Sequence, residues 1–481
     1  MRTHKKKVLT DSISLSIGYL ILKLKGIIFI PIIIATVGLA NYGVFVQLLI
    51  NPRIIIPFIT LELGMAFYRY TSKYDKNEIE KLSNDYWTVS IITFLLSIFG
   101  ALALYFLSPI LSRHILDGTA LNSLRLSSLL VVAGGLSAVD LKYIQCRKKF
   151  KLFSIYEVIY GVFPYIGFVI GIIIKHEIFY GFLLYIIIEI ALALGLKIYI
   201  VKRLQFVLPS ISTLKKFVKY SWALLFSNIT GGLLSKVDRY FIGYFLGPAS
   251  IGMYNIVYSA CSFLGIIGRP FRIYFSVYFP KVWDDGKKNK VRERLKEGLI
   301  YYFVISMGIL VVLVFSLKSI YIFFKEDLIE IDNFELLVLI LGLGIIAFGA
   351  SRFFYQLIKF KEQNYLQLIF QTIGVIINIM LNFWLVQEFG IIGAGIATFI
   401  SYIAVMIMCN FYLNMNIDFN FLIKVLKISI SAIFIMIFLY LKLDADLFHL
   451  ILNIIIAALI YLILILILRV IRISDIRQRF L

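Results

Sequence analysis

The sequence predicts an all-α integral membrane protein with about fourteen transmembrane helices, and three observations lead to this prediction. Of the 481 residues, 61% are hydrophobic and only 16% are charged, which is too little charge to cover a soluble protein. The apolar residues form long runs, and about 20 such residues span a bilayer as a helix. Lys and Arg gather in every second loop between the runs, as membrane topology requires.

Fourteen apolar stretches are long enough to cross the membrane. The first follows a basic N-terminus and is too long for the apolar core of a signal peptide, so we expect an uncleaved helix. The stretches lie at residues 12–37, 43–68, 86–108, 121–141, 153–174, 179–201, 219–246, 250–280, 298–323, 334–358, 365–386, 391–413, 422–441 and 447–468.

The charge of the loops tests this number of helices. Loops on the side of the N-terminus hold 31 Lys and Arg residues, and loops on the other side hold five. A missed or additional helix would exchange the sides of all later loops and remove the difference. The pattern therefore predicts fourteen helices with both the N- and C-termini in the cytoplasm. The outer loops are short and leave no room for a folded domain outside the membrane.

Charge and cysteine pattern also argue against several functions. A formal net charge of +21 would suggest nucleic-acid binding in a soluble protein. Here the basic residues follow the membrane topology, so no nucleic-acid partner is expected. Cys146, Cys261 and Cys409 form no CxxC pair, and the four histidines form no ligand motif. Neither a disulfide framework nor a metal site is therefore expected.

Two similar segments indicate an internal repeat. Residues 38–45 (GLANYGVF) resemble residues 247–254 (GPASIGMY), and each lies at a short outer turn between two helices. Six predicted helices separate the two turns, so both halves enter the membrane in the same orientation. The repeat predicts a first lobe at residues 1–207, a second lobe at residues 208–414 and two additional helices at residues 415–481.

Two segments resemble a known family. Residues 238–254 (DRYFIGYFLGPASIGMY) resemble the helix 7–8 signature of bacterial polysaccharide flippases, and residues 382–398 (NFWLVQEFGIIGAGIAT) resemble their helix 11–12 segment. The chain is thus similar to Wzx-type O-antigen and capsule repeat-unit flippases of the multidrug/oligosaccharidyl-lipid/polysaccharide exporter (MOP) superfamily. The resemblance implies a transporter and not an enzyme.

The resemblance also implies a substrate and surroundings. The substrate would be an undecaprenyl-pyrophosphate-linked oligosaccharide repeat unit, moved from the inner to the outer leaflet by alternating access of two lobes. This step would serve the biosynthesis of a surface polysaccharide such as capsule or the O-antigen of lipopolysaccharide. The location would be the bacterial cytoplasmic (inner) membrane, beside a polysaccharide polymerase and a chain-length regulator. No cofactor is implied, and coupling to H⁺, to Na⁺ or to the membrane potential stays open.

Charged residues inside the predicted helices are the candidate site. A charge at mid-bilayer costs at least ~2.5–3.5 kcal/mol on insertion scales, so it usually faces a cavity or a partner. Arginine suits a pyrophosphate because its planar guanidinium makes paired hydrogen bonds to phosphate oxygens. The sequence therefore predicts a cationic substrate-binding cavity. Its candidate residues are Lys25, Arg53, Lys236, Arg239, Arg269 and Arg272, and the secondary candidates are Lys23, Glu62, Asp238 and Arg352.

Several of these residues also have a structural interpretation. Asp238 would pair with Arg239 or Lys236 and only fix the packing. Glu62 would pair with an arginine of its own helix or at its end, and Arg352 would extend to the lipid head groups. Four other ionisable residues of the first lobe are not chosen, because they lie near helix ends or in later helices. They are Asp140, Glu157, Glu189 and Lys197.

Two other functions within the same superfamily remain alternatives. A cation-coupled multidrug extruder is expected to carry acidic residues deep in the first lobe, whereas the deep charges of the first two helices are mostly basic. A lipid II flippase also handles a pyrophosphate lipid, so charge does not separate it from the first interpretation. A membrane-embedded polymerase or ligase is disfavoured by the short outer loops and by the lack of an acid–base constellation.

Overall fold

The computed structural model describes residues 2–74, 78–324, 333–363, 365–415, 418–441 and 447–471, and the regular elements in these ranges are all α-helices. Their bounds are α1 (Arg2–Thr60), α2 (Leu63–Thr71), α3 (Ile79–Ile115), α4 (Leu121–Ser137), α5 (Asp140–Cys146), α6 (Phe150–Lys175), α7 (Ile178–Val201), α8 (Ile211–Leu234), α9 (Asp238–Leu246), α10 (Pro248–Cys261), α11 (Leu264–Ile267), α12 (Arg269–Asp284), α13 (Lys288–Phe324), α14 (Phe334–Phe360), α15 (Tyr365–Leu413), α16 (Phe419–Leu441) and α17 (Leu447–Ile467).

These helices correspond to the fourteen predicted crossings. Helix α15 holds two crossings that are joined at Gly390 (φ 58°), and α1 holds the first crossing and most of the second, joined at Gly38 (φ 84°), with α2 completing the second. Only glycine adopts such angles without strain, so both turns depend on it. The fourth crossing is divided into α4 and α5, the seventh into α8 and α9, and the eighth into α10, α11 and α12. The all-α membrane fold predicted from the sequence is confirmed.

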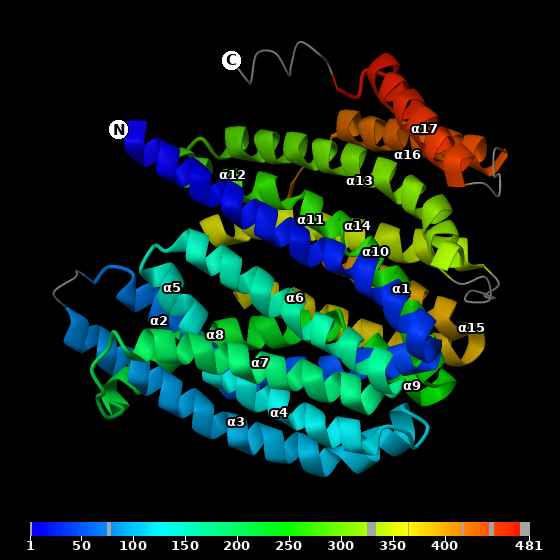
Figure 1. Cartoon of the computed structure of the whole chain (residues 1–481). Helices are drawn as coiled ribbons and strands as arrows, with labels where there is room; N and C mark the ends of the chain where they lie inside the picture. The colour runs from blue at the N-terminus through cyan, green and yellow to red at the C-terminus, as the bar shows by residue number, and fades with distance from the viewer. Residues whose placement is uncertain are drawn as a thin grey trace. The chain divides into compact units, whose positions relative to one another are not determined.

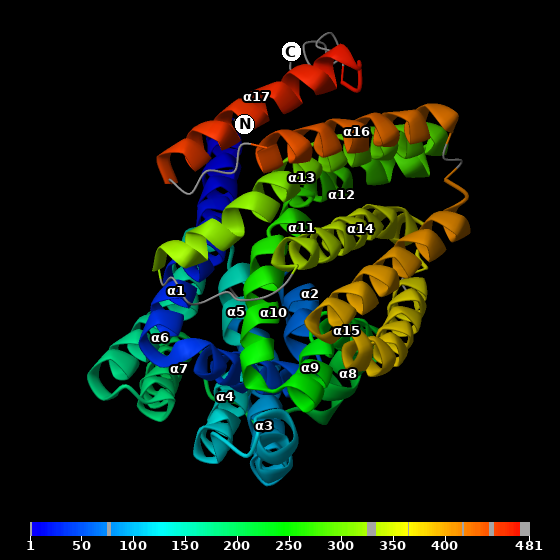
Figure 2. The same ribbon diagram turned by 90° about the vertical axis from the view of Figure 1, so that its right-hand side faces the viewer.

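The chain forms two compact units, Met1–Asn255 and Ile256–Leu481. In the first unit, α3 lies along α4, and α6 lies along both α7 and α1 (Figure 1). In the second unit, α14 packs against α15, and α13 packs against α14 and α16 (Figure 2). The division into repeats at residues 207 and 414 stays a prediction, because these units are defined by packing and not by sequence similarity.

The connections that the sequence assigns to the outside lie together in the first unit. Asn41, residues 120–123 and residues 176–179 line one surface pocket, although they belong to three different connections. A methyl group placed on Gly43 would lie 1.7 Å from the carbonyl oxygen of Pro248, so the two repeat turns are in backbone contact. Glycine is required at this approach because any side chain would collide with the neighbouring backbone.

The connections assigned to the inside also lie together in the first unit. The indole Nε1 of Trp87 donates to the carbonyl oxygen of Gln205 at 2.9 Å. The rings of Tyr70 and Phe217 stack with centroids 5.4 Å apart, which joins α2 to α8. The observed grouping of loops in this unit therefore agrees with the alternation derived from the basic residues.

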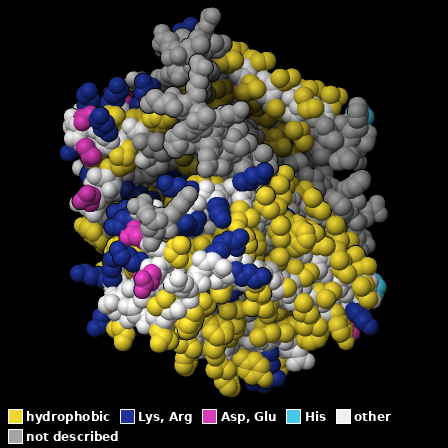
Figure 3. All heavy atoms as spheres, turned by 60° about the vertical axis from the view of Figure 1, so that its left-hand side comes forward, with side chains coloured by type: hydrophobic (Ala, Val, Ile, Leu, Met, Phe, Trp, Pro, Cys, Tyr) yellow, Lys and Arg dark blue, Asp and Glu magenta, His cyan; other side chains and the backbone are white. Residues whose placement is uncertain are grey.

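The outside of the molecule is rich in apolar side chains. Phe99, Phe106 and Leu441 are each more than 70% exposed, although they are large and apolar. Figure 3 shows a broad area of hydrophobic side chains with Lys and Arg gathered beside it. An aqueous surface would not tolerate so large an apolar area, whereas lipid covers it favourably. The chain is a multi-pass membrane protein.

Candidate functional site

Lys25 lies in the first crossing, inside α1, and its ammonium group is held by neutral partners. The Nζ atom donates to the carbonyl oxygen of Gly161 at 2.8 Å. It also lies 4.0 Å from the centroid of the Tyr165 ring, close enough for a cation–π interaction. These contacts fix the position of the charge without neutralising it.

Arg53 and Lys236 complete a cation cluster in the first unit. Arg53 lies in the second crossing, its side chain is exposed, and it interacts electrostatically with Tyr165 and Tyr185. Lys25 lies in the field of Arg53, and so does Lys236, which occupies the break between α8 and α9. The structure thus brings together three of the six predicted cations, which come from three different crossings, and Lys236 also lies in the field of a fourth, Arg239. We call Lys25, Arg53 and Lys236 the first cation cluster.

Glu189 belongs to this site, although it is not among the residues predicted from the sequence. It lies near the middle of α7, and its Oε1 accepts a hydrogen bond from the Tyr160 hydroxyl at 3.2 Å. It also interacts with Tyr185, four residues earlier on the same helix face, and with Arg53 and Lys25. The signal in the sequence was the position of a carboxylate in the centre of a long apolar helix.

Asp238 and Arg239 form a buried ion pair in the first unit. An oxygen of the Asp238 carboxylate lies 2.8 Å from Arg239, and both side chains are nearly inaccessible. The hydroxyl of Tyr254 donates to the other carboxylate oxygen, and the Arg239 guanidinium lies 4.9 Å from the centroid of the Tyr254 ring. Because the charge of Arg239 is neutralised by its neighbour, this geometry favours the structural interpretation of the pair.

The second unit holds a separate group of basic residues. The eighth crossing is interrupted before Arg269, and Pro270 lies in the first turn of α12, where a missing N–H is tolerated. Arg269 is exposed, and Arg272 lies in the same electrostatic environment as Lys359 and Tyr302. Lys359 follows the predicted tenth crossing (334–358), and the structure places it within α14.

Arg352, a secondary candidate, belongs to the same region of the second unit. Its guanidinium lies 4.8 Å from the centroid of the Phe348 ring, one turn earlier in α14. It also interacts with Tyr302, as Arg272 does. The exposed Arg352 side chain therefore rests on an aromatic ring of its own helix.

The two remaining secondary candidates lie elsewhere. Glu62 precedes α2 in a left-handed conformation (φ 52°), and its electrostatic partner is Lys142 of α5. Glu62 therefore interacts with a lysine of another crossing, and not with the arginine that was expected to pair with it. The side chain of Lys23 lies outside the residues that the structure describes.

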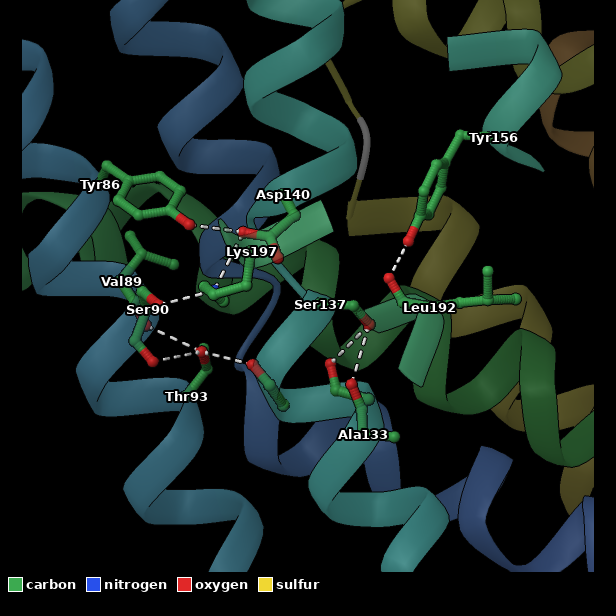
Figure 4. A network of polar contacts seen from close by, with 12 residues as sticks. Tyr86, Val89, Ser90, Thr93, Ala133, Ser137, Asp140, Tyr156, Leu192 and Lys197 are labelled. Carbon is green, nitrogen blue, oxygen red and sulfur yellow. Dashed lines mark hydrogen bonds and ion pairs between the residues drawn. The ribbon is translucent and has the colours of Figure 1, made fainter. Parts of the chain in front are cut away.

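A second buried polar network lies in the first unit, and its residues are also absent from the predicted site. The Nζ atom of Lys197 on α7 lies 2.9 Å from Asp140 Oδ1 and donates to Ser90 Oγ at 2.8 Å (Figure 4). The Tyr86 hydroxyl donates to the same Asp140 oxygen at 2.7 Å. The other carboxylate oxygen, Oδ2, has no hydrogen-bond partner among the described residues. The network joins α3, α5 and α7.

The cations of the first unit are of two kinds, those paired with a carboxylate and those held by neutral groups. Lys197 and Arg239 are neutralised by a carboxylate at ion-pair distance. Lys25 contacts a carbonyl oxygen and a ring, and Arg53 is exposed beside two phenols. In the described part of the chain, no group of three or more His, Cys, Asp or Glu side chains is arranged to hold a metal ion. The arrangement suits an anionic ligand.

The fold is shared with transporters of known structure. The lipid II flippase MurJ in an inward closed conformation matches with a TM-score of 0.72 at 18% identity, over 97% of this chain and 99% of that protein. An inward-facing multidrug resistance MATE family transporter of the MOP superfamily matches with a TM-score of 0.63 at 11% identity, over 85% and 98%. At these identities the matches show the fold alone.

A relative of known name matches part of the sequence. The probable low-salt glycan biosynthesis flippase Agl15 of Haloferax volcanii is 25% identical over 215 residues. The match spans 43% of this chain and 43% of that protein, so less than half of either chain is compared.

Family models cover more of the chain. The MatE model matches residues 223–384, and the model for polysaccharide biosynthesis proteins matches residues 8–280, more than half of the sequence. With the fold, these matches confirm the predicted superfamily and the prediction of a transporter in place of an enzyme. The chain belongs to the polysaccharide biosynthesis protein family and has the fold of the MOP superfamily of transporters.

Proposed function

We propose that this protein moves an undecaprenyl-pyrophosphate-linked oligosaccharide from the inner to the outer leaflet of the bacterial cytoplasmic membrane, for the biosynthesis of a surface polysaccharide. The observation that carries the proposal is the first cation cluster, in which Lys25 and the exposed Arg53 lie within one apolar helical stretch, Leu24–Thr60, long enough to span a membrane. The family match and the glycan-flippase relative support it. Transport would proceed by alternating access, with both termini in the cytoplasm.

The chemistry of the substrate fits this cluster. A pyrophosphate that joins a polyprenyl chain to a sugar carries two negative charges, which need cations inside the membrane. The planar guanidinium of Arg53 offers paired donors to phosphate oxygens, and Lys25 adds a mobile point charge. The phenols of Tyr165 and Tyr185 beside Arg53 provide further polar groups. The polyprenyl chain would remain in lipid while the sugar crosses with the protein.

A cation-coupled extruder is the second candidate, because acidic residues do lie in the first unit. Asp140 is buried beside Lys197, and Glu189 lies beside the first cation cluster. Each carboxylate thus has a basic neighbour, whereas we expect a coupling site for H⁺ or Na⁺ to hold a carboxylate that is free to bind the ion. This difference favours the anionic substrate. A lipid II flippase remains the alternative with the most similar chemistry.

The test is a gene deletion in the host, followed by analysis of undecaprenyl lipids and of the surface glycan. We expect complete repeat units to accumulate on undecaprenyl pyrophosphate while the surface glycan disappears, and the wild-type gene to restore it. Arg53→Ala and Arg269→Ala should both fail to restore the glycan, and lysine at either position should restore part of it.

Arg113→Ala is the matched control, because Arg113 is exposed in the last turn of α3 and should be dispensable. Normal glycan in both alanine variants would refute the cationic site. Unchanged lipids and glycan together with increased drug sensitivity of the deletion strain would favour the extruder. Accumulation of lipid II would identify the third alternative.

A further inference from the structure

We infer that Glu189 sets the net charge of the first cation cluster, so that the cluster binds a doubly substituted pyrophosphate and still releases it. The inference rests on the proposed function and assigns a specificity role to a residue that the sequence pattern alone did not single out. Glu189 would act as an internal anion that competes with the substrate for Arg53 and Lys25.

The geometry connects Glu189 to the cluster through aromatic residues. Lys25 lies 4.0 Å from the centroid of the Tyr165 ring, and this ring contacts that of Tyr185 edge to face with centroids 5.6 Å apart. Tyr185 lies one helical turn before Glu189, whose carboxylate accepts from Tyr160 at 3.2 Å. The phenols are neutral, so they hold the carboxylate in place beside the cations without neutralising its charge.

The charges of the cluster match one class of anion. With all four side chains ionised, Lys25, Arg53 and Lys236 carry three positive charges, and the carboxylate of Glu189 lowers the sum to two. A pyrophosphate that carries both a polyprenyl chain and a sugar has two negative charges. The polyprenyl pyrophosphate that lacks the sugar has a third ionisable oxygen and carries up to three. The carboxylate therefore tunes the cluster toward the sugar-linked form.

A transporter must release its ligand as well as bind it. A cluster with three unopposed positive charges would hold a pyrophosphate strongly, because charge interactions are much larger in a protein interior than in water. Differences in affinity between related complexes lie mostly in the dissociation rate, so excess attraction would slow release. Glu189 offers the cations an alternative partner at the moment when the substrate leaves.

The experiment uses the purified full-length protein and two soluble probes, farnesyl pyrophosphate and farnesyl pyrophosphate linked to a hexose. We expect Glu189→Gln to bind both probes more tightly than wild type, by roughly tenfold for the linked probe, which corresponds to 1.4 kcal/mol, and by a larger factor for the unlinked one. In cells, the same variant should restore less surface glycan than wild type because release is slow. Glu189→Asp, which keeps the charge, should remain close to wild type in both assays.

Glu157→Gln serves as the control, because Glu157 lies on α6 in the field of Lys142 and outside the first cation cluster. Its affinities should equal those of wild type. Equal or weaker binding of both probes by Glu189→Gln, with wild-type binding intact, would overturn the role of Glu189 and leave the proposed function standing. A wild-type protein that binds neither probe and restores no glycan would instead overturn the proposed function, and this inference with it.

Discussion

The ion pair between Asp140 and Lys197 makes a strong prediction about stability. The two charges are 2.9 Å apart, the Asp140 side chain is fully buried and that of Lys197 is 13% exposed. At an effective dielectric constant of 20, this separation gives an attraction of about 6 kcal/mol, most of which offsets the cost of burying the charges. When one partner is removed, the attraction is lost, but the free-energy cost of burying the other charge remains.

Lys197→Met should therefore destabilise the first unit by about 3–5 kcal/mol. The carboxylate of Asp140 would retain only the hydrogen bond from Tyr86, and its Oδ2 atom already lacks a partner among the described residues. Asp140→Asn combined with Lys197→Met should recover most of this loss, because a neutral amide still accepts from Tyr86 and no buried charge remains. Asp140→Asn alone should cost less than Lys197→Met, since Lys197 keeps its contacts with Ser90 and the Tyr86 ring.

The assay is thermal unfolding of the full-length protein in detergent, followed by gel filtration of the remaining folded protein. A loss of this size lowers the midpoint by about 10 °C in a unit of this length. Lys202→Met is the matched control, because Lys202 is an exposed residue directly after α7, the helix of Lys197, and its midpoint should change little. Equal losses in Lys197→Met and in the double variant would refute the coupling and show that Lys197 contributes by packing alone.

Three further predictions follow from single contacts, each measured by the same thermal assay. Gly43→Ala should strongly lower the midpoint, because the added methyl group would collide with the backbone of α10, and an unchanged midpoint would refute that approach. Tyr254→Phe should cost about 1–3 kcal/mol, because an oxygen of buried Asp238 loses its donor, and a neutral effect would contradict this contact. Asp418→Asn should cost less than ~1 kcal/mol, because its pair with Lys296 is exposed. The hydrogen bond from Lys296 lowers the pKa of Asp418. The stabilisation by this pair is therefore fully present above the ordinary aspartate pKa of about 3.9 and is lost as the pH falls through the lowered pKa. Equal stabilisation by the pair at pH 3 and pH 7 would contradict this assignment.

The number of crossings was predictable because apolar length and loop charge are local properties of the sequence. The turns at Gly38 and Gly390 also lie where two apolar runs meet. The interruption of the eighth crossing lies beside Pro270, a residue that disfavours a continuous helix, but nothing in the sequence marks the left-handed conformation at Leu61 and Glu62. No glycine marks that position, and its backbone is determined by packing against other helices.

The candidate site was predictable only in part, and for a physical reason. Lys25, Arg53 and Lys236 stand out because lysine and arginine are rare in apolar runs. Glu189 and Asp140 looked unimportant because their partners come from crossings distant in the sequence. Whether a buried charge is neutralised depends on which helices pack together, and a single sequence does not contain that information.

The partners of the cations explain how one membrane unit separates structure from function. The charge of a cation paired with a buried carboxylate, such as Arg239 with Asp238, is balanced within the protein. A cation held by a carbonyl oxygen and an aromatic ring, such as Lys25, is positioned equally well and keeps its charge. The carbonyl oxygen and the ring hold Lys25 without an opposing charge of their own, so Glu189 alone lowers the positive charge of the first cation cluster without cancelling it. The abundance of tyrosine around this cluster is therefore part of the means by which the protein presents positive charge inside a membrane.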